Sequence, residues 1–172
     1  MNNQIEIRKA TEEDFSEIME IYAYARKTMQ DNGNKTQWGN TRPDAATIHK
    51  DISLSQLYVI EQQQTIHGVF AFIIGADPTY KLIEQGEWKD NSEYGTIHRV
   101  AGDGKVKGIF DITMQFCEQK MKHIRIDTHK DNTIMQHLIE KHGFEKCGII
   151  YASDNTPRLA YEKHAIYHIS QK

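Results

Sequence analysis

Residues 97–117, IHRVAGDGKVKGIFDITMQFC, place an apolar β-type run, three glycines and an amphipathic run one after another. In the last part, Ile109, Ile112 and Phe116 are three or four positions apart, which predicts a helix with one buried face. A strand that enters a helix through a glycine-rich turn offers unpaired backbone N–H groups at the positive end of the helix dipole. The segment therefore predicts a βα unit whose turn binds an anionic group such as a phosphate.

The first half of the chain predicts strand, helix, short helix and hairpin. Residues 4–11 alternate apolar and polar, and Thr11 with Asp14 offers a capping-box-like start for a helix that ends at QDNGN. A short helical pattern follows, which Asp44 or Thr47 could cap. Residues 57–75 hold two β-rich runs around EQQQT and predict a hairpin.

The second half predicts a loop, the βα unit of the glycine turn, a strand, a helix and two final strands. The last helix runs from about Asn132 to His142, with Gly143 placed for a left-handed C-cap. The final strands flank the turn residues SDNTP. The element order is therefore βα(α)ββ followed by βαβαββ, with about seven strands and four helices in one domain over residues 1–172.

Composition limits the kind of protein. A chain of 172 residues with 38% apolar residues suits one compact domain. A formal net charge of −3 without a basic run argues against nucleic acid or an anionic membrane as the main partner. No apolar stretch approaches a membrane span, and the opening residues are charged where a secretory signal is apolar, so we expect a cytoplasmic protein. Cys117 and Cys147 lie in apolar-patterned segments, and we expect buried, reduced thiols.

Three phosphate ligands compete for the glycine turn. A nucleoside triphosphate site needs G-x-x-x-x-G-K-[ST], but Lys105 is followed by valine and lacks the upstream glycine. A dinucleotide site is closer, because Gly102, Gly104 and Gly108 form G-x-G-x-x-x-G and Asp127 ends the next strand. That fold needs further parallel βα units, and the 45 residues after Asp127 end in a predicted hairpin. A dinucleotide-dependent oxidoreductase therefore remains only as an alternative.

The third ligand is the 3′-phospho-ADP and pyrophosphate of coenzyme A. The chain resembles the GNAT superfamily of N-acetyltransferases, in which a strand leads into [QR]-x-x-G-x-[GA], a loop that cradles the pyrophosphate. Residues 99–104, RVAGDG, match literally, and residues 105–110, KVKGIF, match with lysine first and Phe110 last. We prefer the second register, because the amphipathic stripe begins at Ile109 and the N–H groups must belong to the first helical turn.

A second motif supports the resemblance. The superfamily often shows N-x-x-A-x-x-L-Y-E-K-x-G-F after its fifth strand, and residues 132–144 agree at six of its eight defined positions. Met135 and Ile139 are the two departures. The resemblance in element order covers about residues 5–167 and implies a mixed, mostly antiparallel central sheet, acetyl-CoA as cosubstrate and an amine acceptor. The cofactor contacts that it implies are Val100, Lys105, Val106, Lys107, Gly108, Ile109, Phe110, Asn132 and Met135.

The resemblance also implies a mechanism. The fourth and fifth strands would splay to admit the pantetheine arm, and the acceptor amine would attack the thioester directly. The candidate general bases on the fourth strand and at the end of the fifth are Glu93, His98, Asp127 and His129. The family's usual general acid, a tyrosine, falls on Ile139, so Tyr151 or solvent would protonate the leaving thiolate. We take His98, Asp127 and Tyr151 as the candidate catalytic residues.

Other features leave alternatives open. His164 and His168 would share one strand face without further ligands, so we expect no metal site. Trp38 and Trp88 lie in the two irregular segments that border the acceptor site in the family. Edge strands at the C-terminus leave room for a homodimer. A coenzyme A-binding sensor or interaction module without catalysis is the alternative to an N-acetyltransferase, because Phe110 and Ile139 depart from the family pattern.

Overall fold

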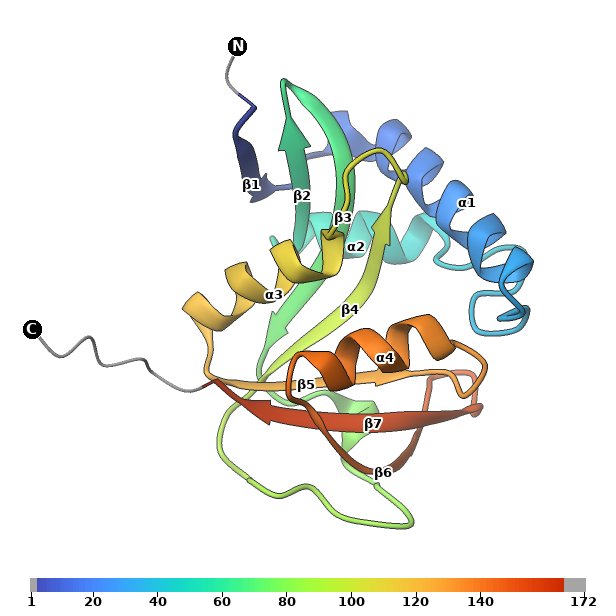
Figure 1. Cartoon of the computed structure of the whole chain (residues 1–172), viewed down its shortest axis with the longest axis vertical. Coiled ribbons are helices and arrows are strands. Elements are labelled where there is room, and N and C mark those ends of the chain that lie inside the picture. The colour runs from blue at the N-terminus through green and yellow to red at the C-terminus, as the bar shows by residue number, and fades with distance from the viewer. Residues whose placement is uncertain (1–2, 166–172) are drawn as a thin grey trace, which may run out of the picture.

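The computed structural model describes residues 3–165 and contains a seven-stranded sheet in the order β1-β2-β3-β4-β5-β7-β6 (Figure 1). All neighbouring strands are antiparallel except β4 and β5, which are parallel. The elements are β1 (Ile5–Lys9), α1 (Phe15–Asp31), α2 (Ala45–Ser53), β2 (Leu57–Gln62), β3 (Thr65–Ile74), β4 (Gly95–Gly102), α3 (Ile109–Lys120), β5 (His123–Thr128), α4 (Thr133–Lys141), β6 (Glu145–Tyr151) and β7 (Pro157–His164). The predicted element order, the fold class and the four helices and seven strands are confirmed.

The sheet is buried on both faces. In β2, Leu57 and Val59 pack with α1 and α2, whereas Tyr58 and Ile60 belong to the core beneath α3 and α4. In Figure 1, α3 and α4 lie in front of the strands and α2 lies behind them. Burial on both faces explains why β2 and β3 have nearly continuous apolar sequences rather than an alternating pattern. Cys117 and Cys147 are buried and free, as predicted.

The helix ends follow the predicted capping residues. The Asp44 carboxylate accepts the Thr47 N–H at 2.8 Å, and the Asn132 side chain accepts the Met135 N–H at 3.0 Å. Gly143, with φ of 84°, follows α4 in the left-handed conformation that glycine tolerates best. The N-terminal helix differs slightly from prediction, because Glu12–Asp14 forms a 3₁₀ turn before α1 begins at Phe15.

The sheet opens between β4 and β5. These two strands pair only where Gly95 meets Ile124 and Thr96 meets Arg125, and they then diverge, as Figure 1 shows. The β3–β4 register shifts between Val69 and Ala71, and in β4 Arg99 has a φ of 53°, so β4 bends away at this point. The divergence of the fourth and fifth strands that the sequence led us to expect is therefore present.

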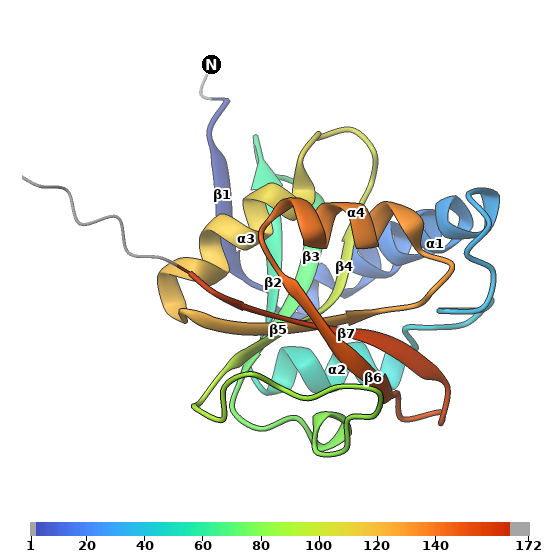
Figure 2. The same ribbon diagram turned by 60° about the horizontal axis from the view of Figure 1, so that its bottom comes forward.

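The long loop at residues 75–94 covers the other end of the sheet. It carries the 3₁₀ turn Pro78–Tyr80 and pairs with the outer side of β6 through a bridge between Glu84 and Ile149 (Figure 2). The C-terminal strand β7 lies inside the sheet between β5 and β6, so only β6 of this pair is an edge strand. No helix among residues 3–165 is long and apolar enough to cross a membrane.

Candidate active site

Two adjoining cavities lie at the opening between β4 and β5. The glycine-loop cavity, about 410 Å³, is bordered by the end of α1, by β4 and by the first turns of α3 and α4. The polar cavity, about 330 Å³, lies between β4, β5, β7 and the connection from α1 to α2. Both cavities are lined by Met29, Val100, Asn132 and Met135. A long, thin ligand could therefore enter through the first cavity and end in the second.

The glycine loop keeps backbone N–H groups available at the start of α3. Gly108 has a φ of 75° and is the N-cap of α3, which begins at Ile109 as the second register predicts. Asp103 holds the loop, because its carboxylate accepts the Lys105 N–H at 2.9 Å and pairs with His67 Nδ1 at 2.7 Å. The first-turn N–H groups of a helix have no partner within the helix, so this arrangement suits an anionic ligand.

The structure brings most of the predicted cofactor residues to this cavity. Those that line it are Val100, Val106, Gly108, Ile109, Phe110, Asn132 and Met135. Lys105 and Lys107 are exposed on the same loop and line neither cavity. Tyr24 and Asn34 also line it, and sequence reasoning missed them. Their segments carry no motif, so only the folded chain shows that they lie here.

Phe110 and Ile139, the two departures from the family pattern, belong to the core. The Phe110 side chain is 4% exposed, and its ring packs edge-on to the His142 imidazole with centroids 5.2 Å apart. Ile139 is fully buried in the same cluster. A large residue at position 110 is therefore accommodated beneath α3 and does not block the loop. Ile139 has no proton to offer a leaving group.

His98 and Asp127 both line the polar cavity and belong to one hydrogen-bonded group. His98 Nε2 lies 2.8 Å from Asp77 Oδ2, and the Tyr80 hydroxyl donates to Asp127 Oδ1 at 2.6 Å. His98 Nδ1 lies 4.0 Å from the same Asp127 oxygen. Asp77 and Tyr80 come from the loop at residues 75–94 and were not found by sequence reasoning.

The surroundings of Asp77 and Tyr80 keep Asp77 ionised and Tyr80 protonated near neutral pH. Burial alone would raise the pKa of Asp77, but the hydrogen bonds from His98 and Thr79 outweigh it and lower that pKa to about 2. Burial and the neighbouring Asp127 raise the pKa of Tyr80 well above its usual value, so its hydroxyl remains a donor. Because the ionised Asp77 accepts the Nε2 proton, a neutral His98 carries its lone pair on Nδ1. The arrangement can therefore accept a proton at that atom.

The other predicted catalytic residues are not brought to the cavities. The Tyr151 hydroxyl donates to Glu84 at 2.9 Å, and Tyr151 lines neither cavity. Glu93 is exposed and also lies outside both cavities. His129 accepts the Asp131 N–H at 3.0 Å, and burial is the main cause that lowers its pKa. The catalytic roles of His98, Asp127 and Tyr151 all stay predictions, and of the three only His98 and Asp127 line the polar cavity.

The two tryptophans differ in position. Trp38 lines the polar cavity and packs edge-on to Tyr22, with ring centroids 5.6 Å apart. Trp88 lines neither cavity, and its ring stacks on the Arg125 guanidinium at 4.0 Å. Of the two irregular segments, the one between α1 and α2 therefore supplies an aromatic wall to the polar cavity.

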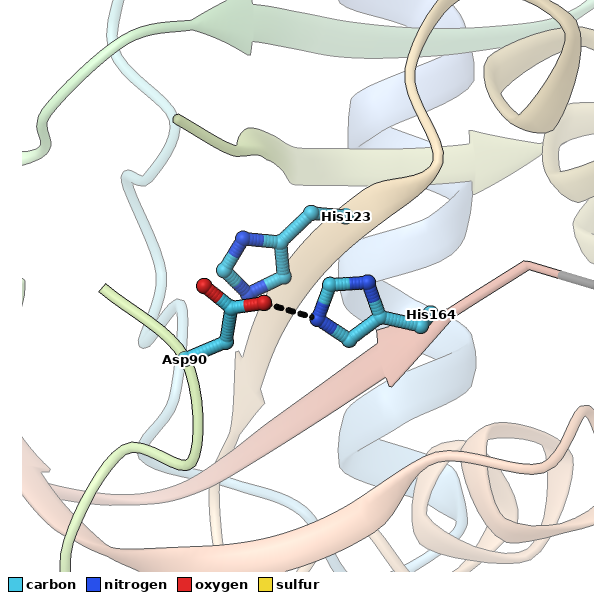
Figure 3. A group of neighbouring side chains, drawn as sticks. All are labelled: Asp90, His123 and His164. Carbon is cyan, nitrogen blue, oxygen red and sulfur yellow. Dashed lines mark ion pairs between the residues drawn. The ribbon is translucent and has the colours of Figure 1, made fainter. Parts of the chain in front are cut away.

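A separate cluster of Asp90, His123 and His164 has the residue types of a metal site (Figure 3). His164 Nε2 pairs with Asp90 Oδ2 at 2.7 Å, and His123 Nε2 pairs with Glu162 at 2.8 Å. The two imidazole rings stack 4.4 Å apart and within 9° of parallel, so their lone pairs lie in parallel planes and do not converge on one point. The cluster forms a hydrogen-bonded network as it stands. His168, the other histidine of the sequence pattern, lies outside the described residues.

Comparison with known proteins gave matches among solved structures only. No protein-family model and no curated protein matched the sequence. A GNAT-family acetyltransferase from Streptococcus agalactiae is 29% identical, with a TM-score of 0.84, and the match covers 95% of this chain and 96% of that one. A ribosomal-protein-alanine N-acetyltransferase from Brucella melitensis is 17% identical over 93% and 99% of the chains, with a TM-score of 0.61. A chain of the NatC complex bound to Gag peptide and CoA is 12% identical, with a TM-score of 0.60, and the match covers 95% of this chain and 99% of that one.

These matches agree with the fold class, a single domain with four helices and a seven-stranded mixed sheet. The similarity to the Streptococcus agalactiae protein extends over nearly the whole of both chains, so the fold is shared from end to end. GNAT acetyltransferases use acetyl-CoA as cosubstrate. The chain therefore has the fold of the GNAT superfamily of acetyltransferases and is an acetyl-CoA-dependent acyltransferase.

Proposed function

We propose that this enzyme transfers the acetyl group of acetyl-CoA to a primary amine of a small molecule or of a peptide N-terminus. The observation that carries the proposal is the position of His98, whose Nε2 is held by Asp77 and whose ring lines a cavity next to the glycine loop. A proton acceptor beside the predicted end of the cofactor is what attack by an amine requires. The ribosomal-protein-alanine N-acetyltransferase and the NatC complex with its peptide support acceptors of the peptide class.

In this proposal, acetyl-CoA lies in the glycine-loop cavity. Its pyrophosphate would contact the backbone of Val106, Gly108 and Ile109 at the start of α3. Lys105 and Lys107, exposed on the same loop, would supply positive charge to the phosphates from outside the cavity. The pantetheine arm would pass Val100 in the opening of the sheet, and the thioester would reach the polar cavity.

The acceptor must attack as a neutral amine. Deprotonation at pH 7 costs about 1 kcal/mol for the α-amine of a peptide N-terminus but about 4.6 kcal/mol for a lysine side chain, so a lysine acceptor depends more strongly on a proton acceptor in the enzyme. His98 Nδ1 would take the proton, and the Asp127 carboxylate would stabilise the resulting imidazolium. The amine nitrogen forms a bond to the acetyl carbon, the carbon–sulfur bond breaks, and the thiolate is protonated by solvent because position 139 is isoleucine.

The transition state also needs a donor for the thioester oxygen. A backbone N–H of β4 next to the opening would fill this role independently of side-chain identity, and removing one such donor in other enzymes costs roughly 3–4 kcal/mol of barrier. We further propose that the enzyme acts in the cytoplasm. A homodimer stays a prediction. The strands β1 and β6 lie at the two edges of the sheet, and an edge strand can pair with a second copy of the chain.

Thermal shift measurements with acetyl-CoA, coenzyme A and NAD test the first step. A ligand at 100 times its Kd adds about 2.7 kcal/mol of stability, so the coenzyme A species should raise the melting temperature and NAD should not. Release of free thiol from acetyl-CoA in the presence of amines and N-terminal peptides tests the second step. Binding without thiol release would favour the sensor or interaction module, and no shift with any coenzyme A species would contradict the whole proposal.

A further inference from the structure

Arg158 differs from the other arginines that line the polar cavity. Arg42 pairs with Asp154 at the rim, and Arg99 pairs with Asp51 at 2.7 Å. Arg158 is 5% exposed, yet no carboxylate oxygen among residues 3–165 lies within 4.0 Å of its guanidinium. A buried charge normally has a charged or fully hydrogen-bonded partner. The charge of Arg158 is therefore open to a partner that the chain does not supply.

The hydrogen bonds of Arg158 leave two of its five N–H donors without a partner in the described chain. Nη1 donates to Thr156 Oγ1 at 2.7 Å and to the Pro157 carbonyl at 3.0 Å, and Nη2 donates to the Gln37 carbonyl at 3.4 Å. A guanidinium has five N–H donors, so within the described part of the chain Nε–H and one Nη2–H have no partner. Two adjacent N–H groups form the fork that binds a carboxylate with two hydrogen bonds.

The direction of the Arg158 pKa change agrees with a buried cation that has no carboxylate in direct contact. Burial is the main cause that lowers its pKa, and the more distant carboxylates of Asp127 and Asp154 oppose that change.

Asp127 and Arg158 are neighbours across two paired strands. Asp127 on β5 lies opposite Ala160 on β7, and Arg158 is two residues from Ala160, so both side chains lie on the same face of the sheet. Such diagonal neighbours are about 7–8 Å apart. The polar cavity thus presents an anion beside His98 and a cation one diagonal step away. A small molecule with an ammonium and a carboxylate would match both charges.

We infer that the acceptor is a small amino-carboxylate, such as a free amino acid, whose carboxylate binds the two unpaired N–H donors of Arg158 and whose amine faces His98 and Asp127. This inference rests on the proposed function and narrows its acceptor class. The cavity volume of about 330 Å³ and its wall of Trp38 and Met29 suit a free amino acid together with the end of the cofactor arm. A carboxylate near the amine also positions it, which keeps the lone pair directed at the thioester.

Thiol release with matched acceptors tests the inference. The acceptors are the common L-amino acids, their amides, and amines of the same side chain without the carboxyl group. The wild-type enzyme should favour the best amino acid over its amide by about 10- to 100-fold in kcat/KM. This is the fold-change that corresponds to the net free energy of a hydrogen bond to a charged group. Arg158→Met should remove this preference, so that the kcat/KM values for an amino acid and its amide become equal to within about threefold. Arg158→Lys, which keeps the charge but loses the fork, should restore part of the preference.

Arg8→Met is the matched control. Arg8 lies outside both cavities and pairs with Asp14 and Glu61, so this variant should keep the wild-type preference. Calorimetry on enzyme saturated with coenzyme A measures amino acid binding without turnover, and the Kd of acetyl-CoA checks that each variant is folded. Equal activity of the wild-type enzyme with amino acids and amides, or an undiminished preference for the amino acid in Arg158→Met, would overturn the inference while the proposed function stands. Amino acid binding that depends on Arg158, without thiol release from any amine, would support the inference and contradict the proposed function.

Discussion

The two cavities of this enzyme are built in different ways. The glycine-loop cavity depends on backbone conformation, with Gly104 and Gly108 at φ values of 78° and 75° and the start of α3 at Ile109. The polar cavity depends on side chains that come from separate parts of the chain, including Asp77, His98, Asp127 and Arg158. In the proposed function, one region would bind its ligand through backbone N–H groups, and the other would select its ligand through the charges of particular side chains.

The difference separates binding from chemistry. A backbone cradle tolerates changes of side chain as long as the loop keeps its conformation, which is why Phe110 can stand where the family keeps a small residue. A charged cavity changes with each substitution, since its groups hold one another in place. Variants in one region should therefore change one property and leave the other intact.

The largest expected effect is the loss of chemistry without loss of cofactor binding. His98→Ala removes the proposed proton acceptor, and kcat/KM for thiol release should fall by about 100- to 10,000-fold. The Kd of acetyl-CoA, measured by calorimetry, should stay within about threefold, because His98 lies outside the glycine-loop cavity. His49→Ala is the control, since His49 pairs with Glu12 at the surface. A His98 variant with full activity would remove His98 from the mechanism.

The next effect tests whether the Phe110 side chain packs in the core or contacts the cofactor. Phe110→Ala should lower the free energy of unfolding by about 3–5 kcal/mol, because the ring is buried. Urea unfolding followed by circular dichroism measures this. Phe116→Ala, in the same core but outside both cavities, should cost less, because that ring is only partly buried.

The two phenylalanine variants also compare affinity. Below the unfolding transition, both should bind acetyl-CoA with nearly the wild-type Kd. A loss of affinity confined to Phe110→Ala, with stability retained, would mean that the ring contacts the cofactor and that the cavity does not depend on backbone alone.

A smaller effect is expected at Gly108. Gly108→Ala places a side chain on a left-handed residue, which costs about 1–2 kcal/mol and should weaken acetyl-CoA binding by up to about 30-fold as the loop relaxes. The preference among acceptor amines should not change. Gly75→Ala is a matched control, because Gly75 also has a positive φ of 117° and an open surrounding but lies outside both cavities. Equal cofactor affinity in both variants would contradict a backbone cradle at α3.

The smallest effect concerns acid stability of the polar cavity. The pKa of Asp77 is lowered from 3.8 to about 2 in the folded protein, since hydrogen bonds from His98 and Thr79 outweigh burial. A carboxyl with a lowered folded pKa stabilises the protein above its unfolded pKa and loses that contribution as the pH falls. Between about pH 4 and pH 2, the melting temperature of the wild type should fall more steeply than that of Asp77→Asn. Parallel curves would show that the Asp77–His98 pair does not stabilise the fold.

Much of the fold was predictable because local patterns agree with the final structure. The spacing of Ile109, Ile112 and Phe116 predicted α3, and the capping residues Asp44 and Asn132 predicted the starts of two helices. Gly143 predicted the end of α4. These features need only neighbouring residues, so one sequence contains them in full. The Gly108 register of the loop follows from the same local rule.

The acceptor side was predictable only in part. His98 was chosen for its place on the fourth strand and Asp127 for its place at the end of the fifth, but Tyr151 was chosen for its chemistry and lies with Glu84 instead. Asp77 and Tyr80 were not found, because a long loop without motif carries them to His98 and Asp127. No local sequence pattern predicts that this loop packs against β4 and β5.

The sequence by itself determined the element order and the glycine loop, because backbone conformation follows from residues close together in the chain, and the class of cosubstrate came only from the resemblance to the GNAT superfamily. The tertiary structure decided which charges meet. Arg158 is buried beside the polar cavity only because β7 pairs with β5 in one register, and a shift of one residue would move its side chain to the other face. The selection of an acceptor therefore depends on contacts between distant segments, and those contacts exist only in the folded protein.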